Sequence, residues 1–162
     1  MPNVPLIVRA KLPTDSNWIV DLLTNRWGST KIVTRSVLHD ADRLPAFVAV
    51  SDDERIGLAT YRIEGDQCEM ISLDSMQESI GVGSALIEAV KDVAHNAGCS
   101  KLWLITTNDN AHAIRFYQRR GFALVAVHAN AIEESRKLKP SIPLFGVGGA
   151  PICDEIEFEI KF

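Results

Sequence analysis

The fold of this chain is decided by the stretch from Ile80 to Gly98, which reads Ile80-Gly81-Val82-Gly83-Ser84-Ala85-Leu86-Ile87-Glu88-Ala89-Val90-Lys91-Asp92-Val93-Ala94-His95-Asn96-Ala97-Gly98. Its apolar residues recur at spacings of three and four, which predicts a helix with one buried face. Two glycines open this helix directly after a predicted strand that ends near Asp74. Because a helix N-terminus offers unpaired N–H groups and a positive dipole end, the stretch indicates a phosphate-binding turn. Taken alone, the two glycines fit a plain strand-to-helix turn better, because a short glycine pattern is a weak signal.

The composition is that of an ordinary globular chain. Of 162 residues, 46% are hydrophobic and 23% are charged, which is enough for one domain with a core that needs neither metal nor disulfide. We therefore expect residues 1–162 to form a single domain. The formal net charge of −4 provides no general attraction to nucleic acid or to an anionic membrane, and neither is expected as a partner.

Several features predict a cytoplasmic location. The three cysteines are an odd number and lack metal-site spacing, which favours free thiols in a reducing compartment. The N-terminus lacks the basic start and apolar core of a signal peptide, and no uncharged run approaches membrane-spanning length. The four histidines also lack the spacing of metal ligands, so no metal is expected.

The pattern around the central helix predicts an α+β fold with one mixed sheet. Residues 46–50, 55–64 and 67–74 are strand-like runs joined by tight turns, as in an antiparallel meander. Residues 102–105 are apolar at every position, as in a strand buried on both faces. The strands before and after the central helix should therefore be parallel and joined by a right-handed crossover.

The other elements follow from shorter signals. For residues 31–45 we expect only a brief extended segment at Ile32 and Val33 and a polar turn or short helix at 39–43. Thr14 or Asp15 is the expected cap of the first helix. The expected strands lie at 6–10, 122–128 and 156–162, the helices at 14–24, 110–120 and 131–139, and a loop at 140–151.

The most specific pattern follows the buried strand and reads Asn110-Ala111-His112-Ala113-Ile114-Arg115-Phe116-Tyr117-Gln118-Arg119-Arg120-Gly121-Phe122. Asn-x-x-Ala-x-x-x-Tyr followed by Gly-Phe, one strand after the glycine turn, resembles the GNAT superfamily of acyl-CoA N-acyltransferases. The resemblance is good over residues 46–128. It implies a mixed, mostly antiparallel twisted sheet flanked by helices.

The glycine turn departs from the pattern of that superfamily at two positions. A Gln or Arg usually stands three residues before the first defining glycine and is followed by another glycine. Here these places hold Glu78 and Ser79, and Gln77 is displaced by one. A carboxylate beside a phosphate weakens anion binding, so the departure bears on the affinity for CoA.

The resemblance implies an N-acetyltransferase that moves an acetyl group from acetyl-CoA directly to a primary amine of a small molecule or peptide. Backbone groups of the strand before the turn would hold the pantetheine arm, and a backbone N–H near Leu73 would stabilise the oxyanion. Backbone N–H groups of the turn would hold the pyrophosphate. The implied cofactor-binding residues are Ile71, Ser72, Leu73, Ser79, Ile80, Gly81, Val82, Gly83, Ser84, Asn110 and Tyr117.

Tyr117 matches the superfamily position that often donates a proton to the CoA sulfur. The alternative is an aromatic residue packed in the core. Asn110 matches a frequent CoA contact, and its alternative is a simple helix cap. For the general base we favour Glu69, which should share a strand face with Ile71 and Leu73, although a solvated strand carboxylate is the simpler interpretation. His39, Asp40 and Asp74 are rival bases.

The acceptor side is the least specified by the sequence. Trp27, Arg35 and His39 stand where relatives often place substrate contacts, but packing or surface charge explains each of them too. A covalent cysteine intermediate is not expected, because no cysteine is near the implied site in sequence. A non-catalytic acyl-CoA sensor or interaction module on the same fold is the main alternative. A second alternative, a nucleotide-dependent oxidoreductase, would need the full Gly-x-Gly-x-x-Gly pattern after an early strand, which this sequence lacks. The sequence leaves the oligomeric state open, and a homodimer is one option.

Overall fold

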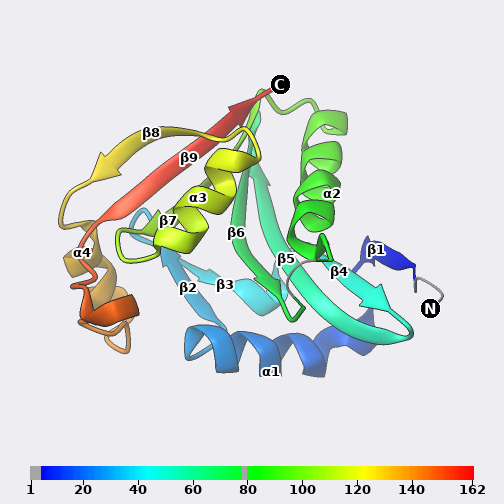
Figure 1. Ribbon diagram of the computed structural model, residues 1–162, viewed down its shortest axis with the longest axis horizontal. Coiled ribbons are helices and arrows are strands. Elements are labelled where there is room, and N and C mark those ends of the chain that lie inside the picture. The colour runs from blue at the N-terminus through cyan, green and yellow to red at the C-terminus, as the bar shows by residue number, and fades with distance from the viewer. Residues whose placement is uncertain (1–4, 78–79) are drawn as a thin grey trace.

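A computed structural model describes residues 5–77 and 80–162 of the chain. Its centre is a seven-stranded sheet with the strand order β1-β4-β5-β6-β7-β9-β8 (Figure 1). Every neighbouring pair is antiparallel except β6 and β7, which are parallel. The predicted mixed, mostly antiparallel α+β fold is confirmed. The strands are Leu6–Ala10 (β1), Ala46–Ser51 (β4), Glu54–Glu64 (β5), Gln67–Ser75 (β6), Lys101–Thr107 (β7), Ala123–His128 (β8) and Glu155–Lys161 (β9).

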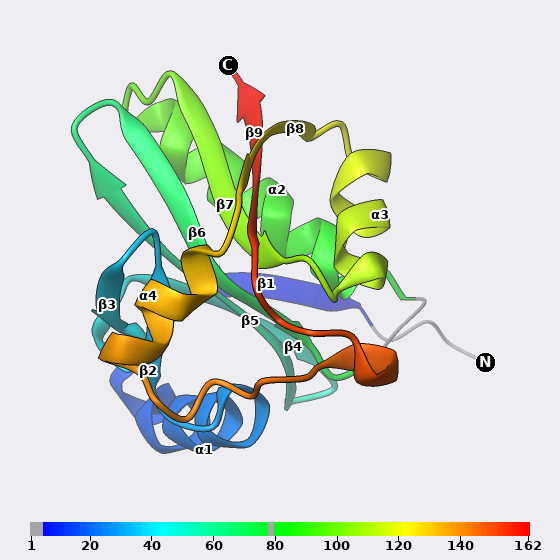
Figure 2. The ribbon, with the colours of Figure 1, turned by 90° about the vertical axis from the view of Figure 1, so that its left-hand side faces the viewer.

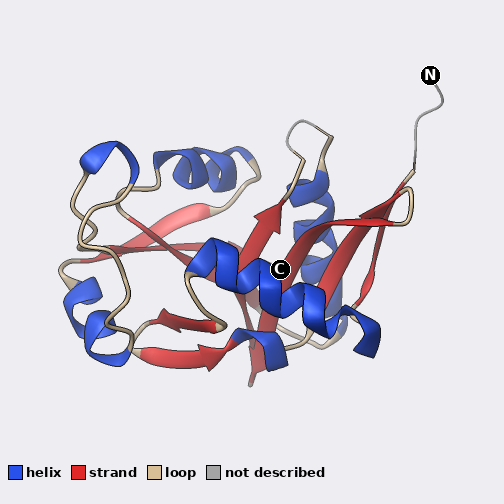
Figure 3. Ribbon diagram, turned by 90° about the horizontal axis from the view of Figure 1, so that it is seen from below, coloured by secondary structure: helices blue, strands red, loops and turns tan. Residues whose placement is uncertain are grey.

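Helices cover both faces of the sheet (Figures 1 and 3). α2 (Val82–Asn96) and α3 (Ala111–Arg119) pack on one face around buried Leu86, Leu104 and Phe158. α1 (Ser16–Trp27) packs on the other, where its Leu23 meets Val48 and Leu58. α4 (Ala131–Leu138) lies beside β2 (Figure 2). Short 3-10 turns occur at Pro13–Asp15, Ala41–Arg43 and Val147–Gly149.

The two parallel strands separate partway along their length. β6 and β7 pair only where residues 67–70 face residues 101–104. Just beyond, the register between β5 and β6 shifts and leaves Ile71 without a direct partner, which is a β-bulge. A bulge bends its strand, so the end of β6 turns away from β7. The resulting opening leaves the backbone of residues 71–75 free on the side that faced β7.

A two-stranded hairpin lies outside the main sheet. Its strands are β2 (Lys31–Thr34) and β3 (Val37–Asp40). The sequence predicted only a brief extended segment here, because the turn between the strands lacks glycine and asparagine. Instead Arg35 and Ser36 adopt positive φ values of 47° and 61°, as a tight hairpin turn requires.

The start of α1 also differs from the prediction. α1 begins at Ser16, and the Asp15 side chain makes no capping hydrogen bond. Its carboxylate is fully buried and accepts hydrogen bonds from Arg9, Arg55 and the backbone N–H of Leu12. Asp15 therefore ties β1 and β5 to the entrance of α1. None of the helices in the described part of the chain is long and apolar enough to cross a membrane.

Candidate functional site

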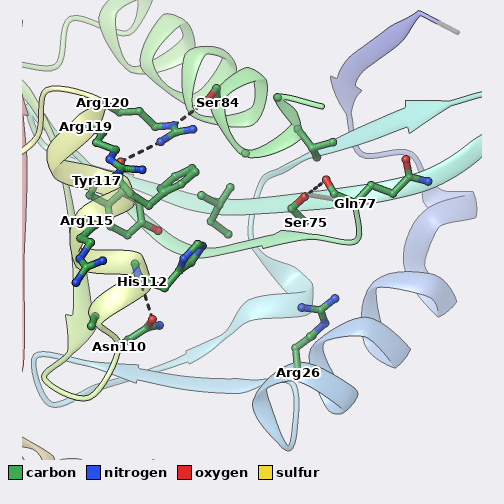
Figure 4. A pocket seen from close by; sticks show the side chains of 17 residues that line it. Arg26, Ser75, Gln77, Ser84, Asn110, His112, Arg115, Tyr117, Arg119 and Arg120 are labelled. Atoms are coloured by element: carbon green, nitrogen blue, oxygen red, sulfur yellow. Dashed lines mark hydrogen bonds between the residues drawn. The ribbon is translucent and has the colours of Figure 1, made fainter. Parts of the chain in front are cut away.

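A cavity of about 840 Å³ opens between the end of β6, the start of α2 and the length of α3 (Figure 4). It lies where β6 and β7 have separated. The sequence predicted cofactor contacts from these same three elements. The described residues that line the cavity are Arg26, Leu73, Ser75, Gln77, Gly81, Val82, Gly83, Ser84, Asn110, Ala111, His112, Ala113, Arg115, Phe116, Tyr117, Arg119 and Arg120.

The first turn of α2 forms one wall of the cavity. Gly81 is its N-cap residue and has a φ of +80°, which favours glycine. The N–H groups of Val82, Gly83 and Ser84 precede the first hydrogen bond within the helix, which Ala85 donates to Gly81. These N–H groups and the helix dipole suit a phosphate.

The structure shows a packing reason for glycine at position 83 that the sequence did not reveal. A Cβ atom there would lie 2.8 Å from the ring of Phe116 on α3. The glycine thus permits the close packing of α2 and α3, in addition to any role in anion approach. Of the predicted turn residues, Gly81 to Ser84 line the cavity, and the exposed Ile80 does not. Ser79 and the departing Glu78 lie outside the described residues.

Basic side chains line the cavity, and within the described part of its wall there is no carboxylate. Figure 4 shows Arg115, Arg119 and Arg120 extending from α3, while Arg26 approaches from α1. Arg120 is held in place, because its guanidinium donates to Ser84 Oγ at 2.8 Å and lies 3.5 Å from the centre of the Phe116 ring. A cavity of this charge in a chain of net charge −4 favours an anionic ligand.

These basic residues were largely missed by sequence reasoning. Arg119 and Arg120 were interpreted as charges at a helix C-terminus, and Arg26, His112 and Arg115 were not singled out. One signal was available, since Arg115 and Arg119 are four residues apart and share a helix face with His112. Arg26 reaches the cavity only because of the way α1 packs on the sheet, and no local sequence pattern predicts that packing.

Tyr117 is 9% exposed and lies at the inner end of this site. Its ring packs edge-on against Phe116 and Phe122, and within the described residues its hydroxyl has no hydrogen-bond partner. Burial raises the pKa of the Tyr117 phenol far above its usual value, the charge of Asp74 adds to the rise, and Arg120 opposes it. The hydroxyl therefore stays protonated at neutral pH and can donate a hydrogen bond.

Asn110 is a helix cap that also lines the cavity. Its side-chain oxygen accepts from the backbone N–H of Ala113 at 3.1 Å. The capping alternative is thus confirmed, while its amide nitrogen remains available to a ligand. On β6, Leu73 lines the cavity, whereas Ile71 packs in the core beneath α1 and Ser72 Oγ lies 2.6 Å from Thr60 Oγ1. Only backbone groups of Ile71 and Ser72 could reach a ligand.

The prediction that Glu69, Ile71 and Leu73 share one strand face is wrong. The bulge at Ile71 shifts the alternation of side chains. Ile71 packs in the core beneath α1, while Leu73 packs in the core beneath α2.

Glu69 is buried in a polar network away from the large cavity. It lines a separate cavity of about 100 Å³ together with Arg62 and Trp103. Thr34 Oγ1 donates to its carboxylate at 2.6 Å, and Arg62 lies 3.7 Å away. Burial raises the pKa of Glu69 to about 7, against the opposing effects of Thr34 and Arg62.

The three predicted acceptor contacts each have a partner within the protein. Trp27 Nε1 donates to Asp74 Oδ2 at 3.0 Å. Arg35 donates to the buried carboxylate of Glu155 through its backbone N–H and its guanidinium. His39 is buried, and its Nε2 lies 2.9 Å from Thr34 Oγ1. None of these three lines the large cavity.

The rival bases differ in their surroundings. Asp40 is exposed and pairs with Lys31. Burial, with a smaller effect of Arg62, lowers the pKa of His39. Asp74 is 8% exposed and follows Leu73, a residue of the cavity wall. In residues 5–77 and 80–162, no group of three or more His, Cys, Asp or Glu side chains is placed to hold a metal ion.

Comparison with known proteins agrees with this geometry. The family model described as the acetyltransferase (GNAT) family matches residues 16–122. The uncharacterized protein YdhI of Bacillus subtilis (strain 168) is 45% identical over 141 residues, which cover 86% of this chain and 88% of YdhI.

Solved structures share the fold at low sequence identity. The IAA acetyltransferase from Bacillus cereus ATCC 14579 superposes with a TM-score of 0.71 at 17% identity, covering 98% of this chain and all (100%) of that one. A GNAT family acetyltransferase from Elizabethkingia anophelis, solved with acetyl-CoA bound, gives a TM-score of 0.68 at 16% identity and covers 97% of this chain and 98% of that one. The matched family model spans most of the chain, including the glycine turn and Tyr117. The chain belongs to the GNAT family of acetyltransferases.

Proposed function

We propose that this protein is an N-acetyltransferase that transfers the acetyl group of acetyl-CoA directly to a primary amine of a small molecule or peptide. The observation that carries the proposal is the large cavity, which joins a helix N-terminus and five basic side chains to a buried tyrosine hydroxyl. A basic end that suits phosphates and an inner end with a hydroxyl donor match the two ends of acetyl-CoA. The fold shared with an acetyl-CoA-bound acetyltransferase supports the same donor.

The part of the site that binds acetyl-CoA would act by holding the donor in position. The N–H groups of Val82 to Ser84 would bind the pyrophosphate, and Arg120, held by Ser84 and Phe116, would add a charge-assisted contact. Backbone groups of β6 left free by the separation from β7 would hold the pantetheine arm and the thioester carbonyl. An N–H group near Leu73 would stabilise the oxyanion of the tetrahedral intermediate.

Tyr117 would assist departure of the thiolate. A hydroxyl that stays protonated can hydrogen-bond to sulfur as negative charge develops there. Its lack of a described partner leaves that hydrogen free for a ligand. A thiol has an ordinary pKa of about 8.5, so the thiolate is a moderate leaving group and this assistance is helpful rather than essential.

An amine-dependent assay of CoA release tests the function. Purified protein with acetyl-CoA and a panel of primary amines should release free CoA thiol in proportion to amine consumed, and mass spectrometry should find the amine heavier by one acetyl group. Tight acetyl-CoA binding without turnover across a broad panel would favour the non-catalytic sensor instead. A cytoplasmic location is part of the same proposal, since the three cysteines are free thiols.

A further inference from the structure

The C-terminal end of α1 is fixed by contacts from the turn that follows it, from β6 and from the residue after α4. Gly28 ends the helix in a left-handed conformation, and its N–H donates to Thr24 O at 3.0 Å. The indole N–H of Trp27 donates to Asp74 on β6 at 3.0 Å. The Lys139 ammonium donates to Trp27 O at 2.7 Å. The last carbonyls of a helix have no partner within it, and two of them are satisfied here.

Lys139 ties together both ends of the turn between α1 and β2. In addition to Trp27 O, its ammonium donates to Lys31 O at 2.6 Å. Burial lowers the pKa of the Lys139 ammonium, so the two carbonyls replace water that this group has lost. The helix dipole also favours a cation at the C-terminal end of α1. Lys139 therefore holds α1, β2 and the segment after α4 in one arrangement.

Arg26 lies in the last turn of α1, next to Trp27, and lines the large cavity. Figure 4 shows its side chain extending from α1 toward Ser75, across the cavity from α3. Within the described residues its guanidinium has one hydrogen-bond partner, the sulfur of Met76 at 3.7 Å. A thioether is a weak acceptor. Most of the donors of Arg26 therefore remain available to an anionic ligand.

The strength of such a contact depends on how firmly the backbone of Arg26 is held. Its side chain is exposed, and a long exposed side chain loses rotamer freedom when it binds a ligand. A fixed backbone reduces the remaining cost of ordering. The peptide carbonyl next to Arg26 is that of Trp27, which Lys139 holds.

We propose that Lys139 is a positioning residue for the donor, because it fixes the end of α1 so that Arg26 binds a phosphate group of acetyl-CoA. This inference rests on the proposed acetyl transfer. The other arginines of the described cavity wall lie on α3 or at its C-cap, so Arg26 adds a contact from the opposite side. Lys139 does not line the cavity and acts only through α1. The segment after α4 thereby affects the affinity of a site that it does not touch.

A double-mutant cycle between Lys139 and Arg26 tests this coupling. Lys139→Met keeps an aliphatic stem and removes the ammonium, while Arg26→Gln removes the guanidinium. Calorimetry at low ionic strength measures the Kd of acetyl-CoA for the wild type, both single variants and the double variant, and chemical denaturation measures their stability. Lys139→Arg is the conservative variant, because a guanidinium can still donate to both carbonyls. Lys137→Gln, on the exposed face of α4, removes the same charge nearby.

We expect Arg26→Gln to raise the Kd by about 10-fold through loss of a charge-assisted contact. Lys139→Met should raise it by about 5-fold alone, but by less than about 1.5-fold when Arg26 is already Gln, because no arginine is left to position. Lys139→Arg should stay within about twofold of the wild type, and Lys137→Gln likewise. Lys139→Gln replaces Lys139→Met in the cycle if the methionine variant does not fold.

Three results would overturn the inference. Equal effects of Lys139→Met with and without Arg26 would show that the lysine stabilises α1 and positions nothing. An unchanged Kd for Arg26→Gln would remove Arg26 from the donor site. An equal effect of Lys137→Gln would assign the loss to net charge. The proposed acetyl transfer fails separately if the wild type binds acetyl-CoA and follows the cycle yet transfers acetyl to no acceptor, whereas a wild type that does not bind acetyl-CoA would remove both.

Discussion

Tyr117 is the residue on which the proposed chemistry of the donor depends most directly. Tyr117→Phe should lower kcat by about 10- to 100-fold, because positioned proton donation is lost while a thiolate still departs fairly easily. The ring packing against Phe116 and Phe122 is retained, so acetyl-CoA affinity should stay within about twofold. Steady-state kinetics and calorimetry on the same preparation check both points.

A matched control for this variant is Tyr61→Phe. Tyr61 stacks on Phe47 at the edge of the same hydrophobic core and does not line the large cavity. The Tyr61→Phe variant should leave turnover unchanged. A fully active Tyr117→Phe would mean that the tyrosine serves packing alone.

Asp15 governs stability rather than catalysis. Hydrogen bonds from Arg9, Leu12 and Arg55 hold the pKa of its carboxyl far below the ordinary range, against the opposing effect of burial. A carboxyl whose pKa is lower in the folded state stabilises the fold above its unfolded pKa of about 4 and loses that contribution as pH falls. Asp15→Asn should cost about 2–4 kcal/mol at pH 7, and much less at pH 2.

Chemical denaturation at several pH values measures this difference. Exposed Asp21→Asn on α1 is the control and should stay within about 0.5 kcal/mol of the wild type. A cost of Asp15→Asn that does not change with pH would contradict an ionic role.

At the residue scale, sequence reasoning worked where a residue type has a local pattern. Asn110 and Tyr117 could be found because both lie in one short helical motif. The faces of Glu69 and Leu73 could not be assigned, since a single bulge at Ile71 reverses the alternation. Asp15 looked like a helix cap because its arginine partners lie 6 and 40 residues away.

At the level of elements, the contact between α2 and α3 shapes the proposed pyrophosphate site. A Cβ atom at Gly83 would lie 2.8 Å from the Phe116 ring, and Arg120 lies on the same ring. Gly83→Ala should therefore destabilise the fold by about 1–3 kcal/mol, as overpacking in a well-packed core does. It should also weaken acetyl-CoA binding through displacement of Arg120.

A second substitution separates packing from ligand contact. Phe116→Leu alone removes the cation–π contact with Arg120, and in the double variant Gly83→Ala/Phe116→Leu it makes room for the new methyl group. The double variant should recover part of the stability lost by Gly83→Ala. Unfolding free energies of the wild type and the three variants form a double-mutant cycle. Strictly additive losses of stability would contradict the proposed clash.

Elements with strong local signals were predicted well. The central helix, strand β7 and the two-residue turn at Gly65 and Asp66 all appear close to their expected positions. The predicted burial of β7 on both faces was wrong, because only Leu102 and Leu104 of this strand are buried. The β2–β3 hairpin was missed, because Arg35 and Ser36 form its turn without a residue typical of positive φ. What holds that turn is the distant Glu155, which accepts from Arg35 at 3.0 and 3.3 Å.

At the scale of the whole molecule, the distribution of charge is more informative than its sum. The chain carries −4 overall, yet Arg26, His112, Arg115, Arg119 and Arg120 gather around one cavity. The strand order, with β9 inserted between β7 and β8, likewise depends on contacts between distant segments. Neither feature follows from local patterns, and this limits what the sequence alone predicts about the site.

The basic cavity predicts a salt-dependent affinity for the donor. The double variant Arg115→Gln/Arg119→Gln should raise the Kd of acetyl-CoA by about 10-fold at low ionic strength, because two contacts to phosphate charge are lost. The difference from the wild type should shrink as salt screens the charges. Lys137→Gln on the exposed face of α4 is the control, and an equal effect there would show that only net charge matters.

The most direct test of the central claim is a calorimetric titration of the purified protein with acetyl-CoA, with NAD as the comparison ligand. The account predicts saturable binding of one acetyl-CoA per chain, an affinity that falls as salt is added, and no binding of NAD. Absence of acetyl-CoA binding, or binding of NAD in its place, would contradict the assignment of the large cavity as the donor site.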